Sequence, residues 1–99
     1  MIENILPPVV DEQTKVLIVG SMPGVQSLEK QQYYGNPRNH FWRIIGEVTG
    51  VIVPEQYEER LALVKKHCIG LWDVIRECER VGSLDSNIKN EIPNDFVVL

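Results

Sequence analysis

A short apolar run that ends at a glycine constrains the fold of this chain more than any other feature. Residues 15–19 read KVLIV, are rich in β-branched side chains, and are followed at once by Gly20. A continuous apolar run of this length is typical of a strand buried on both faces inside a parallel sheet. Such a strand needs strand neighbours on its edges and cover on both faces. The run therefore predicts an α/β fold with residues 15–19 as a central strand.

The segment after this run brings three kinds of recognition group together. Gly20–Gly24 (GSMPG) reads as a tight turn with free backbone N–H groups, and residues 26–32 read as a loop or a short helix. The paired aromatic residues Tyr33 and Tyr34 follow, and then Asn39 at the head of an amphipathic helix. N–H groups, aromatic rings and one amide around a single crevice suit a flat, hydrogen-bonding ligand such as a nucleobase.

Two helices are expected in the middle of the chain. Asn36 and Pro37 form a typical helix start, with an Asx cap and proline at the first helical position, and Gly50 ends this helix. Its apolar face is expected to hold Phe41, Ile44, Ile45 and Val48. A second helix is expected to open at Pro54 and stop at Gly70, with Tyr57, Leu61, Val64 and Cys68 on one stripe.

The remaining segments offer no convincing partner for the central strand. Residues 71–75 read as a short strand or a helical turn, and residues 82–95 are polar and turn-rich. The runs at 51–53 and 96–99 are too short or incomplete. Since two helices and one strand do not close an α/β layer, we expect residues 1–99 to be the N-terminal portion of a single larger domain.

Composition and charge narrow the class of protein. The chain is 43% hydrophobic and 24% charged, and it contains no apolar run near the ~20 residues that span a bilayer. Its N-terminus lacks the features of a signal peptide, so we expect a cytoplasmic protein without a membrane partner. The two cysteines, Cys68 and Cys78, lack the paired spacing of a metal site, so we expect free thiols, no metal and no cofactor. The net charge of −4 argues mildly against nucleic-acid binding, but the stretch from Lys30 to Arg43 holds three basic residues and no acid.

The order GSMPG, short loop, YYGNPRNHFW resembles the uracil-DNA glycosylase superfamily. The resemblance is to its mismatch-specific branch and to the related DNA-deoxyinosine glycosylases, and it rests on the motif Pro37-Arg38-Asn39-His40-Phe41-Trp42. The stretch CIGLWDVIRECERVGSLDSNI, residues 68–88, also resembles the deoxyinosine branch. The resemblance implies a three-layer α/β/α sandwich around a central parallel sheet, of which the C-terminal part is missing here. It further implies a monofunctional DNA glycosylase of base-excision repair.

One departure from the family pattern moves the expected catalytic centre. The mismatch-specific branch has an Asn two residues after the first glycine of the turn, where it positions the attacking water, and this chain has Met22 there. A thioether does not orient water, so the resemblance to the deoxyinosine branch assigns the catalytic role to Asn39. The implied base pocket comprises Gly20, Ser21, Met22, Pro23, Gly24 and Tyr34. Arg38 and His40 are the expected DNA contacts.

The resemblance also implies the partner, double-stranded DNA with a deaminated base, and a monomeric enzyme at work on a bacterial or archaeal nucleoid. Hypoxanthine is the favoured base, with uracil or mismatched thymine as alternatives. The family opens the duplex with a Ser/Pro- and Asn-rich loop that nothing here matches, so a fragment that only binds nucleic acid is a further alternative. A small nucleotide-binding module is a third.

Plain structural roles remain open for the same residues. The glycine turn is by itself a weak signal, the two tyrosines and Trp42 also fit core packing, and Asn39 also fits a helix cap. Asp73 lies between Trp72 and Val74 and is expected to cap or turn the chain, with a functional acid as the alternative. Asp85 and Ser86 are expected to form a turn, with a pocket wall as the alternative.

Overall fold

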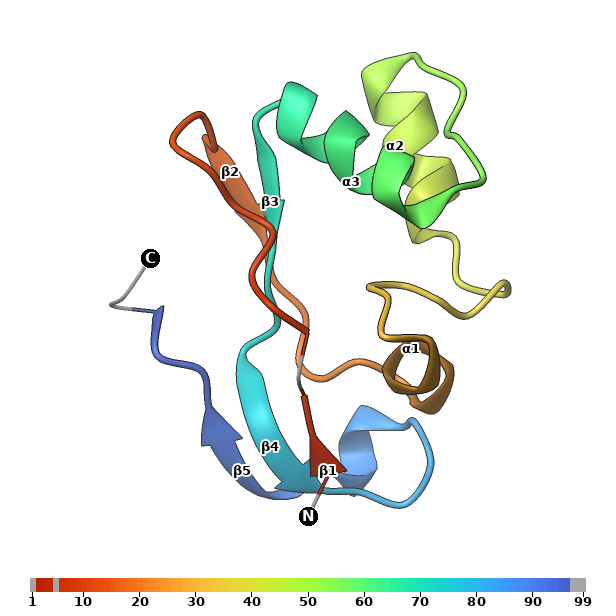
Figure 1. Ribbon diagram of the computed structural model, residues 1–99. Coiled ribbons are helices and arrows are strands. Elements are labelled where there is room, and N and C mark those ends of the chain that lie inside the picture. The colour runs from red at the N-terminus through yellow and green to blue at the C-terminus, as the bar shows by residue number, and fades with distance from the viewer. Residues whose placement is uncertain (1, 5, 97–99) are drawn as a thin grey trace.

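The computed structural model describes residues 2–4 and 6–96, and it arranges the strands on one side and the helices on the other (Figure 1). The strands form two small sheets that follow one another along the molecule. The elements in chain order are β1 (Ile2–Glu3), β2 (Val16–Ile18), α1 (Val25–Lys30), α2 (Phe41–Thr49), α3 (Tyr57–Lys66), β3 (Ile69–Leu71), β4 (Ile75–Glu79), a 3-10 turn at Asp85–Asn87, and β5 (Lys89–Pro93).

The parallel pair β2–β3 carries the predicted strand, but the expected lack of a partner was wrong. Leu17 pairs with Gly70, and the whole of β2 runs alongside β3. The partner strand β3 was not predicted because Gly70 interrupts its apolar pattern. Glycine is required there, since a Cβ on Gly70 would lie 2.9 Å from the carbonyl oxygen of Val9, which bridges to Leu71 from the other side.

The second sheet is antiparallel and was not expected. Its strand order is β1-β4-β5, and β5 lies in the segment predicted to be polar and turn-rich. All residues of β5 are exposed, so its side chains show no alternation for a sequence pattern to detect. Burial of β2 on both faces was also wrong for the described residues, because Val16 is 57% exposed. The α/β class is confirmed, whereas the sheets have mixed strand directions and the three-layer parallel sandwich stays a prediction.

Both predicted helices exist, and each begins a few residues later than expected. The helix α2 begins at Phe41 rather than at Pro37, since Asn36 forms an Asx turn in which its Oδ1 accepts the Arg38 N–H at 2.9 Å. It ends at Gly50, whose φ of 70° lies in the left-handed region, as predicted. The helix α3 begins at Tyr57, three residues after Pro54.

The core gathers where the helices meet the strands. The predicted stripe on α3 is confirmed at Val64, which is fully buried, but the face of α2 was only partly right. Trp42 and Ile45 are buried, whereas Val48 is 73% exposed. The main cluster of buried side chains is Leu6, Val9, Tyr33, Trp42, Ile45, Leu63, Val64, Leu71 and Trp72.

Cys68 and Cys78 are free thiols, and within residues 2–4 and 6–96 no three metal-binding side chains come together. None of the described helices is long and apolar enough to cross a membrane. The predictions for residues 97–99 lie outside the described part of the chain.

Candidate functional site

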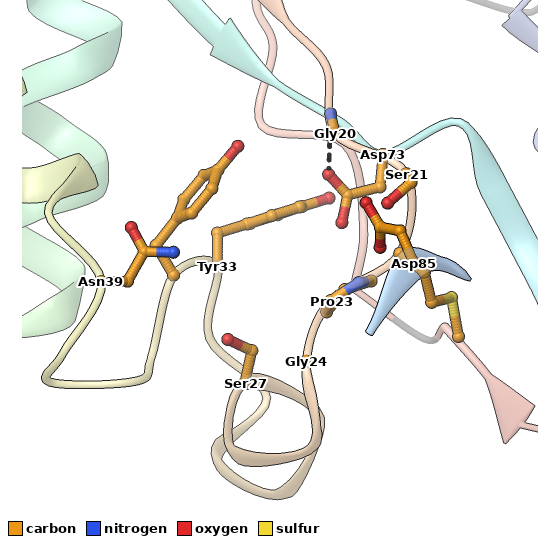
Figure 2. A pocket seen from close by; sticks show the side chains of 11 residues that line it. Gly20, Ser21, Pro23, Gly24, Ser27, Tyr33, Asn39, Asp73 and Asp85 are labelled. Carbon is orange, nitrogen blue, oxygen red and sulfur yellow. Dashed lines mark hydrogen bonds between the residues drawn. The ribbon is translucent and has the colours of Figure 1, made fainter. Parts of the chain in front are cut away.

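A cavity of about 230 Å³ lies beyond the end of β2, with the glycine turn on one side and Tyr33 and Asn39 on the other (Figure 2). Its lining includes all six predicted pocket residues and the predicted catalytic residue: Gly20, Ser21, Met22, Pro23, Gly24, Tyr34 and Asn39. It also includes four residues from elsewhere: Ser27, Tyr33, Asp73 and Asp85. The structure thus brings the predicted residues together around one cavity, and their roles stay predictions. The acidic wall comes from residues 50 and more positions further along the chain.

The glycine turn keeps three N–H groups without a protein acceptor among the described residues. The strand pairing continues into the turn, because Val74 N–H donates to Gly20 O at 2.8 Å and Ile75 N–H to Ser21 O at 2.9 Å. The N–H groups of Ser21, Met22 and Gly24 donate to no acceptor in the described part of the chain. Backbone donors held in a rigid turn are suited to bind a carbonyl or a developing anion.

Met22 contributes its backbone to the pocket and its side chain to the core. The side chain is 6% exposed and packs with Ile75 and Cys78. This packing accounts for an apolar residue at a position where the resemblance would place an amide. The transfer of the water-positioning role from residue 22 to Asn39 stays a prediction.

The two tyrosines have different roles: Tyr33 packs in the core, and Tyr34 lines the cavity. Tyr33 is 2% exposed, and its hydroxyl donates to the Pro7 carbonyl oxygen at 2.7 Å, so it is a core residue that reaches the pocket wall. Tyr34 adopts a φ of 55° and stacks on Phe41 at a centroid distance of 3.7 Å and an angle of 12°. Burial, with the charge of Asp73 adding to it, raises the pKa of Tyr34 to about 12. Tyr34 is therefore a neutral ring, supported from one side and lining the cavity.

Asn39 lies across the cavity from Asp73 and Asp85 (Figure 2). It lies two residues before Phe41, the first residue of α2, and its Oδ1 accepts the Phe41 N–H at 2.8 Å. The N-cap of α2 is His40 and not Asn39, so this bond is an Asx turn that leads into the helix, and it fixes the orientation of the amide. The Nδ2 group donates to no acceptor among the residues described, so Asn39 presents an N–H₂ donor to the cavity.

Asp73 is the site residue that sequence reasoning undervalued. It is 5% exposed, and its Oδ1 accepts the Gly20 N–H at 3.1 Å. Its other oxygen accepts no hydrogen bond from the described residues. Burial raises the pKa of this carboxyl, the Gly20 N–H opposes the rise, and the charge of Asp85 adds to it. The available signal was an acid placed between Trp72 and Val74, directly after an apolar run.

The contact between Gly20 and Asp73 makes glycine obligatory at the turn. A Cβ on Gly20 would lie 2.8 Å from Asp73 Oδ1, closer than packing allows. We expect Gly20→Ala to lower the free energy of unfolding by about 1–3 kcal/mol, as measured by urea denaturation. In an Asp73→Ala background the same change should cost clearly less, since the clashing atom is gone. Equal costs in both backgrounds would contradict this account.

Arg38 and His40 are exposed and line no part of this cavity. Cationic groups instead border an adjoining hollow of about 480 Å³ that shares Tyr34 and Asn39 with the pocket. The charged residues on this second hollow are Lys30, Arg43 and Arg60 together with the acid Glu55, so cations are in excess there. The local excess of basic residues read from the sequence thus lies beside the candidate site, although its members differ from the two predicted ones.

A strand end is followed by a glycine turn, and a supported aromatic ring faces a small polar cavity, so the chain is an α/β protein with a candidate site at the end of a parallel strand. The family model described as the uracil DNA glycosylase superfamily matches residues 7–94, and the chain belongs to that superfamily. It is similar to the hypoxanthine DNA glycosylase of Methanosarcina acetivorans, with 48% identity over 97 residues that cover 97% of this chain and 61% of the relative. The hypoxanthine DNA glycosylase of Methanosarcina barkeri is 47% identical over 94 residues, which cover 94% of this chain and 60% of that protein.

A solved structure shows the same fold. The solution NMR structure of a protein from Methanosarcina acetivorans, named as a candidate uracil DNA glycosylase, matches with a TM-score of 0.81 and 49% identity. The match covers 92% of this chain and 57% of the solved one. The chain thus spans about three fifths of the length of the relatives it matches.

Proposed function

We propose that this chain carries the base-binding pocket of a monofunctional DNA glycosylase that releases hypoxanthine from deoxyinosine in DNA. One observation carries the proposal: a single cavity brings together the Asn39 amide, the free N–H groups of the glycine turn and a buried Asp73 carboxylate. Relatives named hypoxanthine DNA glycosylase at 47–48% identity support the choice of base.

The proposed site acts on a base that has left the duplex. A flipped base enters the cavity beside the Tyr34 ring, which Phe41 supports, and stacking of this kind is worth roughly 1–3 kcal/mol. The cations Lys30, Arg43 and Arg60 of the adjoining hollow lie where the strand backbone would pass. We assign the DNA phosphates to this hollow, together with the exposed Arg38 and His40.

The proposed chemistry is hydrolysis of the N-glycosidic bond. A water adds to the anomeric carbon as the bond to the base breaks, so positive charge develops on the sugar and negative charge on the departing base. The Asn39 N–H₂ and the N–H groups of Ser21, Met22 and Gly24 supply donors for the base. The second lone pair of Asn39 Oδ1 accepts from the attacking water, whose oxygen joins the sugar and whose proton ends on the released base. None of these groups is a strong base, so catalysis rests on positioning and electrostatic stabilisation.

Asp73 accounts for the choice of a deaminated base. Deamination of adenine turns N1 from an acceptor into an N1–H donor, and deamination of cytosine does the same at N3. An acceptor in the pocket therefore favours hypoxanthine and uracil over adenine and cytosine. Because Gly20 N–H holds one oxygen of Asp73, the other oxygen is a fixed acceptor at the acidic wall.

A cleavage panel tests the proposal. We expect the protein to form abasic sites in duplexes with deoxyinosine faster than in duplexes with deoxyuridine or with thymine opposite guanine, and not with deoxyadenosine. Alkaline strand scission of end-labelled duplexes reports the product. Faster release of uracil would favour the alternative substrate. No abasic product at enzyme excess, together with binding to a duplex, would favour a protein that only binds nucleic acid.

A further inference from the structure

Arg80 is a buried cation that pairs with no carboxylate in the described part of the chain. The residue is 7% exposed, and its guanidinium donates to two backbone carbonyls, from Nη2 to Pro23 O at 2.7 Å and from Nε to Gly82 O at 2.8 Å. Its Nη1 is buried without an acceptor among the described residues. Burying an unpaired guanidinium costs free energy, so a role tied to its contacts is expected.

The contact with Pro23 fixes one peptide plane of the glycine turn. The Pro23–Gly24 peptide is trans, so its carbonyl and its N–H point in opposite directions. Pro23 and Gly24 line the cavity, whereas Arg80 does not, so the guanidinium holds the carbonyl from behind the turn. By this peptide geometry the Gly24 N–H points away from the guanidinium, and it has no acceptor among residues 2–4 and 6–96.

The charge of Arg80 also strengthens that donor. A hydrogen bond from a charged group to a carbonyl is about twice as strong as a neutral one. It polarises the peptide, so the N–H at the other end becomes a better donor. The pocket itself holds two carboxyl groups, on Asp73 and Asp85, which disfavour an anionic leaving base. Arg80 is the buried cation in the described part of the chain, and its positive charge at the turn offsets the negative charge of these two carboxyl groups.

We propose that Arg80 is a positioning residue, which directs and polarises the Gly24 N–H so that it stabilises the negative charge on the departing base. The proposal rests on the glycosylase function proposed above. It concerns the bond-breaking step and not substrate binding, because a neutral base in the ground state gains little from a polarised donor.

Leaving-group dependence tests this role. We expect Arg80→Met to lower the single-turnover rate on deoxyinosine about tenfold or more, with little change in the affinity for DNA. The loss should be several-fold smaller with 8-azahypoxanthine, whose anion is more stable and needs less help to depart. Arg80→Lys keeps the charge and should restore part of the rate. Arg76→Met, on the same strand but at an exposed site, is the matched control and should behave as the wild type.

Two outcomes separate this inference from the proposed function. If the wild type cleaves and the Arg80 variants are slowed by the same factor on hypoxanthine and 8-azahypoxanthine, only the proposed role of Arg80 is overturned. A wild type that cleaves neither base overturns the glycosylase function. A second measurement does not depend on cleavage. The amide ¹H resonance of Gly24 should move upfield in Arg80→Met and less in Arg80→Lys. An unmoved resonance would contradict polarisation of this N–H by Arg80. If Arg80→Met does not fold, the cleavage rates and the Gly24 amide resonance of Arg80→Lys test the role of Arg80 instead.

Discussion

Replacing Asn39 by Ala is expected to lower the rate of hypoxanthine release by about 10²–10³-fold, the loss typical of removing one donor that stabilises a transition state. The side chain presents its Nδ2 to the cavity while Phe41 N–H holds its Oδ1, so no neighbouring group replaces the donor. Single-turnover cleavage of a deoxyinosine duplex measures the effect. Duplex binding should persist, since the cations of the adjoining hollow are untouched.

The same substitution removes the Asx turn that leads into α2, so its structural cost needs a matched control. Asn36 makes the same kind of Asx turn three residues earlier, with its Oδ1 accepting the Arg38 N–H at 2.9 Å. It lines the adjoining hollow beside the cations but does not line the pocket. Asn36→Ala and Asn39→Ala should each cost about 1 kcal/mol of stability or less. Only the Asn39 variant should lose cleavage. Equal losses of cleavage in the two variants would assign Asn39 to the Asx turn alone.

Asn39→Asp sharpens the test further. Aspartate accepts the Phe41 N–H as well as asparagine does, so the Asx turn is retained. The variant lacks the N–H₂ donor and adds a negative charge facing the departing base. We therefore expect cleavage by Asn39→Asp to fall at least as far as in Asn39→Ala, while the melting temperature stays near that of the wild type. Cleavage near the wild-type rate would show that the oxygen of residue 39, and not its amide nitrogen, does the work.

The local part of the site was readable from the sequence because its residues are close in the chain. The strand end, the glycine turn, Tyr34 and Asn39 lie within 25 residues of each other, and turn and cap chemistry specify them locally. The position of the acidic wall, formed by Asp73 and Asp85, could not be predicted from local sequence. Asp73 meets Gly20 across 53 residues, and only the pairing of β2 with β3 brings the two together.

The strands that were missed share a physical reason. Strand β3 contains Gly70, which packing against Val9 requires, and β5 exposes every residue. Neither pattern has the apolar period that marks a strand. The helices show the opposite error, since the period was present at Ile44 and Val48 although both are at least half exposed. In α2 the large ring of Trp42, and not the whole apolar stripe, sets the buried face.

Asp73→Asn is expected to change the base preference while it leaves the turn in place. Gly20 N–H needs an acceptor, so the amide oxygen of the substituted side chain takes the position of Oδ1 and the amide nitrogen replaces the free oxygen. The pocket then offers a donor where it offered an acceptor. A lost hydrogen bond to a charged group is worth about 1.5–3 kcal/mol, so release of hypoxanthine should fall by about 10–100-fold. Adenine, with an acceptor at N1, should gain relative to hypoxanthine, and an unchanged ratio of the two rates would remove Asp73 from base selection.

The same substitution should stabilise the fold, because burial raises the pKa of Asp73. A raised pKa means that ionising the carboxyl costs more in the folded than in the unfolded chain. This cost is absent below about pH 4, where the group is protonated in both states. It grows as the pH rises toward the raised pKa and is constant above it. Asparagine carries no charge, so the melting temperature of Asp73→Asn should match that of the wild type in acid and exceed it at pH 7. A variant that is less stable at pH 7 would mean that the Gly20 N–H bond to the carboxylate outweighs the burial of its charge.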